Sequence, residues 1–237
     1  MSSNRGMTSS PPSLAAERLD PARPDPGRSD PGRSYGGVTQ AERTARRRAS
    51  FLDAGLQVFG STGFRTATVR QLCREAGLTD RYFYESFASI EDLLVAVYER
   101  EFDHLQQVVL ATLAGDAAQQ DPMAAVDQAL KALFEMASEP RVARVCWLEV
   151  LGVSARVDGV YTRNIERFAA LVVAFARQRL GAITLSEPES RMLGIALIGA
   201  VSQPVTHWLL GGYQEDRATM VAATSRVFRG VILGLSG

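Results

Sequence analysis

The sequence predicts an all-α protein with a three-helix helix-turn-helix domain near the N-terminus and a C-terminal helical bundle. From residue 40 onward, apolar residues recur at helical spacing, and no stretch alternates apolar and polar residues as a strand does. Glycines and prolines divide this part into helix-sized segments. With 46% hydrophobic residues among 237, the chain is long and apolar enough to bury a core.

The first 38 residues differ in composition from the rest of the chain. Six of the ten prolines lie here, and the pentapeptide DPGRS occurs at Asp25–Ser29 and again at Asp30–Ser34. Large apolar residues are almost absent, so this segment cannot bury enough surface to offset its chain entropy. We therefore predict a disordered arm over residues 1–38.

The helix-turn-helix is expected from three short helical segments in a row. Leu52, Leu56 and Phe59 share one face of the first helix, which the glycines at 60 and 63 should end. Thr68 and Gln71 form a capping-box pattern at the start of the second helix. Gly77 should end it, Thr79 should cap the third, and the tight turn between them is what a helix-turn-helix requires.

The remaining helices are expected from start and stop signals in the same way. Ser89 should cap a long helix that ends near Leu113. Later proline and glycine positions predict helices over 122–138, 141–152, 156–180, 187–210 and 215–233.

Charge points to a nucleic-acid partner for the helix-turn-helix. The segment from Ala41 to Arg81 has eight arginines and four acidic residues, although the whole chain has a net charge of zero. The third helix of such a motif enters the major groove of DNA with its N-terminal end. The residues expected there are Thr79, Asp80, Arg81, Tyr82 and Tyr84.

Individual side chains in this segment have more than one interpretation. Arg81 could contact guanine, and Tyr82 could pack on a thymine methyl group or simply on the protein scaffold. Arg46, Arg47 and Arg48, placed before the first helix, should contact the sugar-phosphate backbone. The N-terminal arm either follows the DNA, as homeodomain arms do, or is an inert leader.

Residues 48–94 resemble the TetR family of bacterial regulators. The family pattern is matched in order by Phe59, Gly63, Phe64, Thr68, Val69, Leu72, Ala76, Gly77, Leu78, Thr79, Phe83, Tyr84, Phe87, Ser89 and Leu93. The resemblance implies a DNA-binding domain over 39–88 and an effector-binding and dimerisation domain over 89–237. It also implies that Thr68 and Tyr84 contact phosphate, and that the partners are a double-stranded operator, a second copy of the chain and a small-molecule effector.

In the C-terminal half, the resemblance implies a ligand pocket and a dimer interface built by the last two helices. For the pocket we expect aromatic and apolar residues with a few polar ones: Phe102, Leu105, Phe134, Trp147, Tyr161, Phe168, Gln203, His207 and Trp208. For the interface we expect a set of apolar and small residues: Leu193, Leu197, Ala200, Val201, Val227, Phe228 and Val231. Because few of these residues ionise, a mostly apolar effector is expected.

The motifs of other function classes are missing from the sequence. It contains no P-loop, no G-x-S-x-G or H-E-x-x-H motif and no metal-spaced His/Cys cluster, so we expect no enzyme activity, no cofactor and no metal. The longest apolar run, Met192 to Val201, is too short to span a bilayer, and the N-terminus lacks a signal-peptide pattern. We therefore expect a cytoplasmic protein without a membrane partner.

Together these features predict a repressor that a small, mostly apolar ligand releases from a palindromic operator. The alternatives are an activator or architectural DNA-binding protein of the same fold without an effector, and a redox sensor based on Cys73 in the helix-turn-helix.

Overall fold

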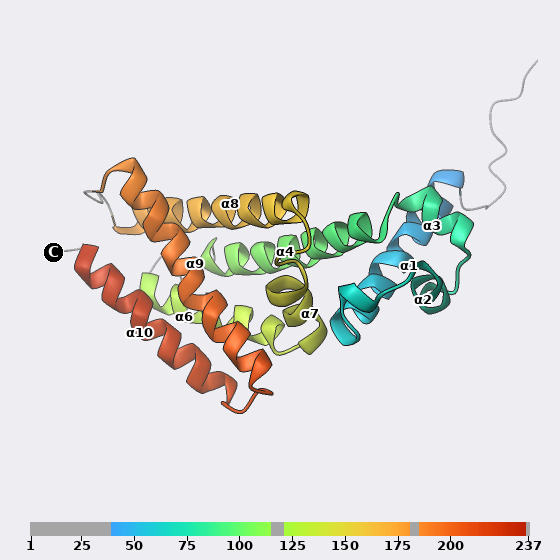
Figure 1. Ribbon diagram of the computed structural model, residues 1–237. Coiled ribbons are helices and arrows are strands. Elements are labelled where there is room, and N and C mark those ends of the chain that lie inside the picture. Colours follow the sequence, from blue (N-terminus) through green and yellow to red (C-terminus); the bar gives the residue numbers. More distant parts are fainter. Residues whose placement is uncertain (1–38, 115–120, 181–184, 236–237) are drawn as a thin grey trace, which may run out of the picture. The chain divides into compact units, whose positions relative to one another are not determined.

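The computed structural model describes residues 39–114, 121–180 and 185–235 (Figure 1). Throughout these ranges the regular elements are helices, so the all-α fold class is confirmed. The predicted N-terminal arm, residues 1–38, lies outside the described residues.

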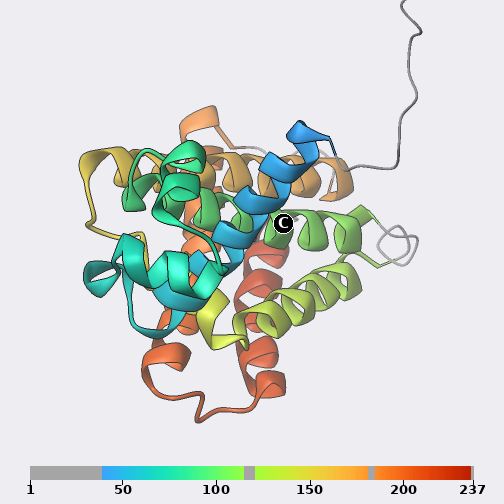
Figure 2. The ribbon, with the colours of Figure 1, turned by 90° about the vertical axis from the view of Figure 1, so that its right-hand side faces the viewer.

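Three helices near the N-terminus form a small domain, called the head below. They are α1 (Gln40–Ser61), α2 (Val69–Ala76) and α3 (Asp80–Ser86), with a 3-10 turn, η1 (Phe64–Thr66), after α1. Both α2 and α3 pack on α1, as Figure 2 also shows. Phe51 and Phe83 are fully buried between α1 and α3, with ring centroids 5.4 Å apart and edge to face. This aromatic contact fixes α3 on α1.

The helix ends of the head follow the sequence with two differences. Gly77 has a φ of 65°, which ends α2 in the left-handed conformation as predicted. Thr68 accepts a hydrogen bond from the Gln71 amide at 3.2 Å, but the Gln71 side chain donates to Thr62 at 3.4 Å, so the capping box is only half formed. Thr79 occupies the N-cap of α3 as predicted, but its side chain makes no capping hydrogen bond there.

The rest of the described chain forms a helical bundle. Its elements are α4 (Ile90–Ala114), α6 (Pro122–Ala137), α7 (Pro140–Arg144), the π turn η2 (Val145–Glu149), α8 (Ala155–Leu180), α9 (Glu187–Leu210) and α10 (Arg217–Leu235). Helix α4 packs on α6 and α8, α8 packs on α9, and α6 packs on α10. The single helix predicted over 141–152 is therefore wrong, because η2 follows the short α7 and ends at Glu149.

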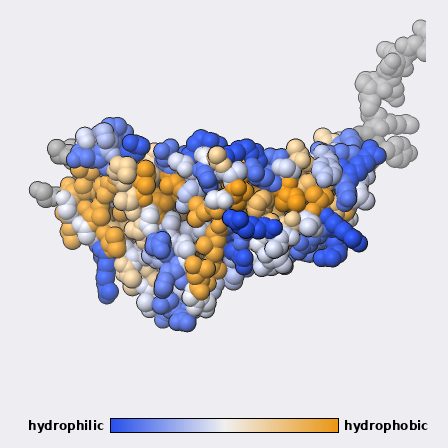
Figure 3. Space-filling view, in the orientation of Figure 1, coloured by the Kyte–Doolittle hydropathy of each residue, from blue (hydrophilic) through white to orange (hydrophobic). Residues whose placement is uncertain are grey.

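The last two helices bury only part of their apolar surface within the chain. Both are long and apolar enough to cross a membrane, yet only 33% of the apolar stretch of α9 and 22% of that of α10 is buried. Met192 and Leu233 are 54% and 74% exposed. Figure 3 shows hydrophobic residues at the surface over this part of the bundle. An exposed apolar surface of this kind marks a site of interaction with another molecule.

The head meets the bundle at a close approach between α1 and α7. A Cβ atom on Gly60 would lie 2.5 Å from Cβ and 2.6 Å from Cα of Arg141, which leaves no room for a side chain. We expect Gly60→Ala to lower the free energy of unfolding by about 1–3 kcal/mol through overpacking, measured by urea denaturation. Gly159→Ala in α8, where only the Arg163 guanidinium is near, is the control and should not destabilise the protein. Equal effects of the two substitutions would contradict the prediction.

Candidate functional site

The outer surface of the head presents α3. The Arg81 side chain is 83% exposed and Tyr84 is 62% exposed, so both can reach a partner in solution. Thr68, Thr79 and Asp80 are also exposed. Within the chain, Arg81 forms an ion pair with Glu85 one turn later, and its Nε lies 2.9 Å from the Glu85 carboxylate.

The three consecutive arginines lie inside α1 and not before it, so this part of the prediction is wrong. The Arg47 guanidinium lies 4.2 Å from the ring centre of Tyr82, and that of Arg48 lies 4.2 Å from the ring centre of Phe87. Arg48 also donates a hydrogen bond to the Ser86 carbonyl at 2.8 Å. These contacts hold α3 against α1. For the half-buried Tyr82, they favour the interpretation that its ring packs on the protein scaffold. Arg46 is exposed and remains free to contact a partner.

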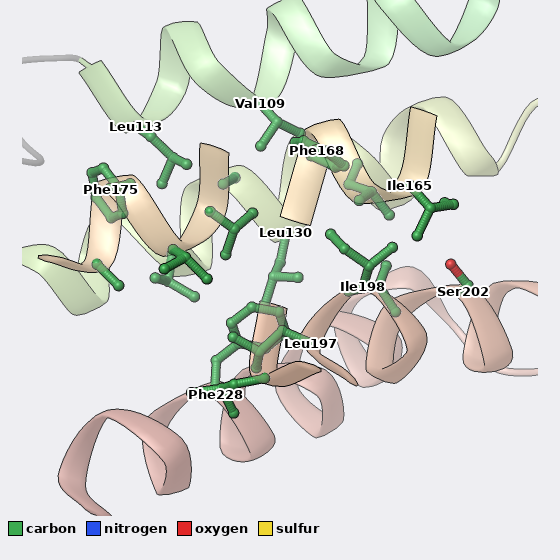
Figure 4. Close-up of a pocket in the computed structure, with 18 of the residues that line it drawn as sticks. Val109, Leu113, Leu130, Ile165, Phe168, Phe175, Leu197, Ile198, Ser202 and Phe228 are labelled. Atoms are coloured by element: carbon green, nitrogen blue, oxygen red, sulfur yellow. The ribbon is translucent and has the colours of Figure 1, made fainter. Parts of the chain in front are cut away.

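A cavity of about 120 Å³ lies inside the bundle, between α4, α6, α8, α9, α10 and η2. In Figure 4, Val109 of α4, Phe168 of α8 and Ile198 of α9 project into the space between these helices. Five of the nine expected pocket residues line it: Phe102, Leu105, Trp147, Tyr161 and Phe168. None of the described lining residues is charged, so the site suits an apolar molecule.

The other four expected pocket residues do not line the cavity. Phe134 is fully buried and packs edge to face on Trp208, with ring centroids 6.0 Å apart. The indole of Trp208 donates to the Glu215 carbonyl at 2.8 Å, which ties α9 to the start of α10. Gln203 and His207 are exposed on α9. The first pair belongs to the core, and the second pair lies on the exposed face of α9.

Several residues expected at the dimer interface face the cavity instead. These are Leu193, Leu197, Val201, Phe228 and Val231. Leu197 and Val201 are buried within the chain, so they are not available to a second copy. Val227 is 48% exposed and Ala200 is partly exposed, so both remain accessible. The same two helices therefore present one apolar face to the cavity and another to solvent.

The π turn η2 connects the cavity wall to the head. Cys146 and Trp147 line the cavity, and Glu149 at the end of the same turn reaches the head. One Glu149 oxygen accepts from the Phe64 amide at 2.7 Å, and the other accepts from Arg144 Nε at 2.7 Å. Sequence reasoning missed Glu149, because its partner in the head lies 85 residues away and no local pattern marks the pair.

Gly63 makes this contact possible. Its φ of 89° is one that L residues with side chains rarely adopt, and a Cβ there would lie 3.2 Å from a Glu149 oxygen. The glycine that precedes η1 thus allows a carboxylate of the bundle to approach the backbone of the head. The π geometry of η2 is itself uncommon and frequently marks functional sites.

The thiol of Cys73 is held in its protonated form. The side chain is buried in the head, and burial together with a hydrogen bond to Asp80 raises its pKa to about 11. Because the thiolate is the form that reacts with oxidants, this environment works against redox chemistry near neutral pH.

The described residues define a helix-turn-helix protein whose head is joined to an apolar cavity. Comparison with known families agrees, since residues 51–97 match the family described as bacterial regulatory proteins, tetR family. The match runs from Phe51 in α1 to Val97 in α4, so it covers most of the head and the start of the bundle.

Two relatives match larger parts of the chain, and solved structures share its fold. The HTH-type transcriptional repressor NicS of Pseudomonas putida is 28% identical over 132 residues, which span 56% of this chain and only 59% of that protein. The fatty acid metabolism regulator protein of Bacillus subtilis is 18% identical over 185 residues, spanning 78% of this chain and 93% of that protein. FadR of Bacillus halodurans has the same fold, with a TM-score of 0.62 at 18% identity over 76% of this chain and 93% of that one. FadR of B. subtilis, solved in complex with stearoyl-CoA, gives 0.64 at 14% identity over 76% and 96%.

Proposed function

We propose that this protein is a homodimeric transcriptional repressor that leaves a palindromic operator when a small apolar molecule occupies its cavity. The observation that carries the proposal is η2, a five-residue turn that lines the cavity at Trp147 and holds the head at Glu149. Two similar proteins support it, since NicS is a repressor and B. subtilis FadR was solved in complex with stearoyl-CoA.

Operator contact is assigned to the exposed side chains of the head. Arg81 reads a base in the major groove, and Tyr84, Thr68 and Arg46 contact phosphates. Thr79 and Asp80, at the start of α3, lie where this helix enters the groove. Arg47 and Arg48 support this contact indirectly. Both stack on aromatic rings, those of Tyr82 and Phe87, and so keep α3 in place.

A second copy of the chain covers the exposed apolar faces of α9 and α10. Val227 and Ala200 remain the interface residues from the sequence, and Met192 and Leu233 join them because they are exposed on the same helices. A two-fold dimer places two heads on two half-sites, which is why the operator should be palindromic. With its apolar surface covered in this way, the protein is a cytoplasmic, non-enzymatic regulator.

The experiment that tests the proposal is selection from a random pool of DNA duplexes with the full chain, followed by salt titration of the enriched sequence. We expect a palindrome whose half-sites lie about one helical turn apart and whose affinity falls steeply as salt rises. Failure to enrich any sequence would overturn operator binding. An enriched site without inverted symmetry would overturn the dimer.

Arg81→Ala is expected to weaken operator binding by about 1–3 kcal/mol and to relax preference at one base pair of each half-site. The measurement is a binding titration against the operator and a set of single-base variants. Arg163→Ala, an exposed arginine on α8 remote from the head, is the matched control and should leave both quantities unchanged. If Arg81→Ala weakens all sequences equally, Arg81 contacts phosphate and not a base.

The alternative functions differ in which agent, if any, dissociates the complex with the operator. An activator or architectural protein of this fold would bind DNA without responding to any molecule in the cavity. A sensor based on Cys73 would respond to peroxide, but the raised pKa of its thiol favours ligand control.

A further inference from the structure

A buried serine in the wall of the cavity is bonded to an arginine that reaches the solvent. Ser190 of α9 lines the cavity and is 2% exposed. Its hydroxyl oxygen accepts a hydrogen bond from the guanidinium of Arg177 on α8 at 2.9 Å. The Arg177 side chain is 42% exposed, so the pair extends from the cavity wall to the surface. A cation therefore lies directly behind a lining hydroxyl.

Both groups have hydrogen-bond donors to spare. In the described part of the chain, Arg177 uses a single terminal nitrogen, Nη2, which donates to Ser190 and, at 3.1 Å, to the Glu187 carboxylate. A guanidinium has five N–H donors, so Nε and the other terminal nitrogen remain available. The Ser190 oxygen acts as an acceptor, and its own hydrogen has no acceptor among the described residues. Donors of this kind suit a carboxylate, which only accepts.

The acidic residues near Arg177 leave it available to another anion. Glu187 is 82% exposed, and an exposed ion pair contributes little to stability, so a second carboxylate can displace it. Glu189 is engaged elsewhere, because its carboxylate accepts from the amide and the hydroxyl of Ser186 at 2.8 and 2.6 Å. A bound anion would therefore meet a cation that is only weakly paired.

The other end of the cavity is less suited to an anion. Figure 4 shows Phe175 and Leu113 at one end and Ser202 at the opposite end, and Arg177 follows Phe175 closely on α8. The buried Glu101 lies about 18 Å before Leu113 along α4, so it belongs to the Ser202 end. Its carboxylate would repel a second anion there. An anionic group is therefore expected at the end that has the arginine.

We infer that the cavity takes a single-chain amphiphile with a free carboxylate, of the fatty-acid class, and that Arg177 and Ser190 bind the carboxylate. The apolar chain runs from there along α9 toward Ser202, over about 18 Å at the rise of an α-helix. The inference rests on the proposed function for the role of the cavity, and it adds the chemical class and the direction of the ligand. The lining itself stays uncharged, because the arginine lies behind it.

The test compares probes with the same chain and different head groups. Binding of decanoate, 1-decanol and decylammonium to the full chain is measured by calorimetry at pH 7.5, where the first and the last are ions. A cavity without a partner for an ion would favour 1-decanol, since an alcohol costs less to remove from water. We expect decanoate to bind at least as tightly as 1-decanol and at least about tenfold more tightly than decylammonium. Tighter binding of either other probe, or no binding of decanoate, would overturn the inference.

An arginine variant separates head-group binding from a purely structural role. Arg177→Gln keeps a donor and removes the charge, so decanoate affinity should fall at least about tenfold while 1-decanol affinity changes less than about twofold. Arg167→Gln is the matched control, because this exposed arginine also ties α8 to another helix, through Asp103 at 2.6 Å, without being bonded to a lining residue. It should leave both affinities unchanged. Equal losses for decanoate and 1-decanol in Arg177→Gln would mean that Arg177 only holds the two helices together.

Serine variants test the direction of the ligand. Ser190→Ala should weaken decanoate binding about threefold to tenfold, because the carboxylate loses the hydroxyl donor. Ser202→Ala, on the same helix and in the same cavity, is the control and should change decanoate affinity by less than about twofold. The reverse order of effects would place the carboxylate at the Ser202 end and contradict the assignment.

The two proposals fail in different ways. If decanoate binds through Arg177 but the selected operator is retained, ligand-released repression is wrong and the ligand class stands. If 1-decanol binds more tightly than decanoate and releases the operator, the regulatory proposal stands and the ligand class is wrong.

Discussion

Phe83→Ala is expected to lower the free energy of unfolding by about 3–5 kcal/mol, because it removes the central ring of the head. Phe83 is fully buried and contacts the rings of Phe51, Tyr84 and Phe87 at centroid distances between 5.3 and 6.1 Å. It lies on α3, so its loss should loosen the helix that carries Arg81. The measurement is urea denaturation together with operator binding, and we expect operator binding to be lost.

A neighbouring residue provides the control for this prediction. Tyr84 is 62% exposed, so Tyr84→Ala should change stability by no more than about 0.5 kcal/mol while still weakening operator binding. Phe83→Ala therefore tests the fold of the head and Tyr84→Ala tests its surface. A loss of stability below about 1 kcal/mol for Phe83→Ala would mean that α3 is held by other contacts.

Glu149→Ala is expected to have the second large effect, on stability and on the response to ligand. It leaves the Phe64 amide without its 2.7 Å acceptor and Arg144 without its carboxylate, at a cost of about 1–3 kcal/mol. With the link between η2 and the head removed, occupancy of the cavity should weaken operator binding about twofold or less, compared with the 5–150-fold that is usual for allosteric coupling.

The conservative variant makes the interpretation specific. Glu149→Gln keeps an oxygen for the Phe64 amide and loses the charge that pairs with Arg144, so stability should suffer less than in Glu149→Ala while the response to ligand is still reduced. Glu187→Gln, which breaks an exposed ion pair with Arg177, is the matched control and should change neither. A full ligand response in both Glu149 variants would show that the signal reaches the head through other contacts, such as those between α1 and α4.

The helices could be predicted well because their ends are encoded locally. Thr68, Gly77 and Ser89 mark ends that the structure places where the sequence indicates, and Ser89 caps α4 by accepting from the Asp92 amide at 3.0 Å. The exception is the region after Pro140, where η2 and Gly152, with a φ of 68°, interrupt what apolar spacing suggests is one helix.

Residues of the cavity and the interface could be predicted only in part. Apolar spacing identifies the buried face of a helix, but it does not say whether that face meets a core, a cavity or a second chain. This is why Trp208 proved to be core, and why Leu197 lies at the cavity when the sequence placed it at the interface. Glu149 gave no signal, because its importance depends on a contact with Phe64, which is distant in the sequence.

The ion pair between Arg81 and Glu85 bears on how such a protein searches a genome. In the proposed complex with DNA, a closed pair leaves Arg81 less free to bind phosphate, so we expect the head to hold unrelated DNA more weakly than an unpaired arginine would allow. Breaking the Arg81–Glu85 ion pair is offset only where a base accepts hydrogen bonds from the guanidinium. We therefore expect the pair to widen the gap in residence time between the operator and unrelated sites, because it weakens binding to the unrelated ones.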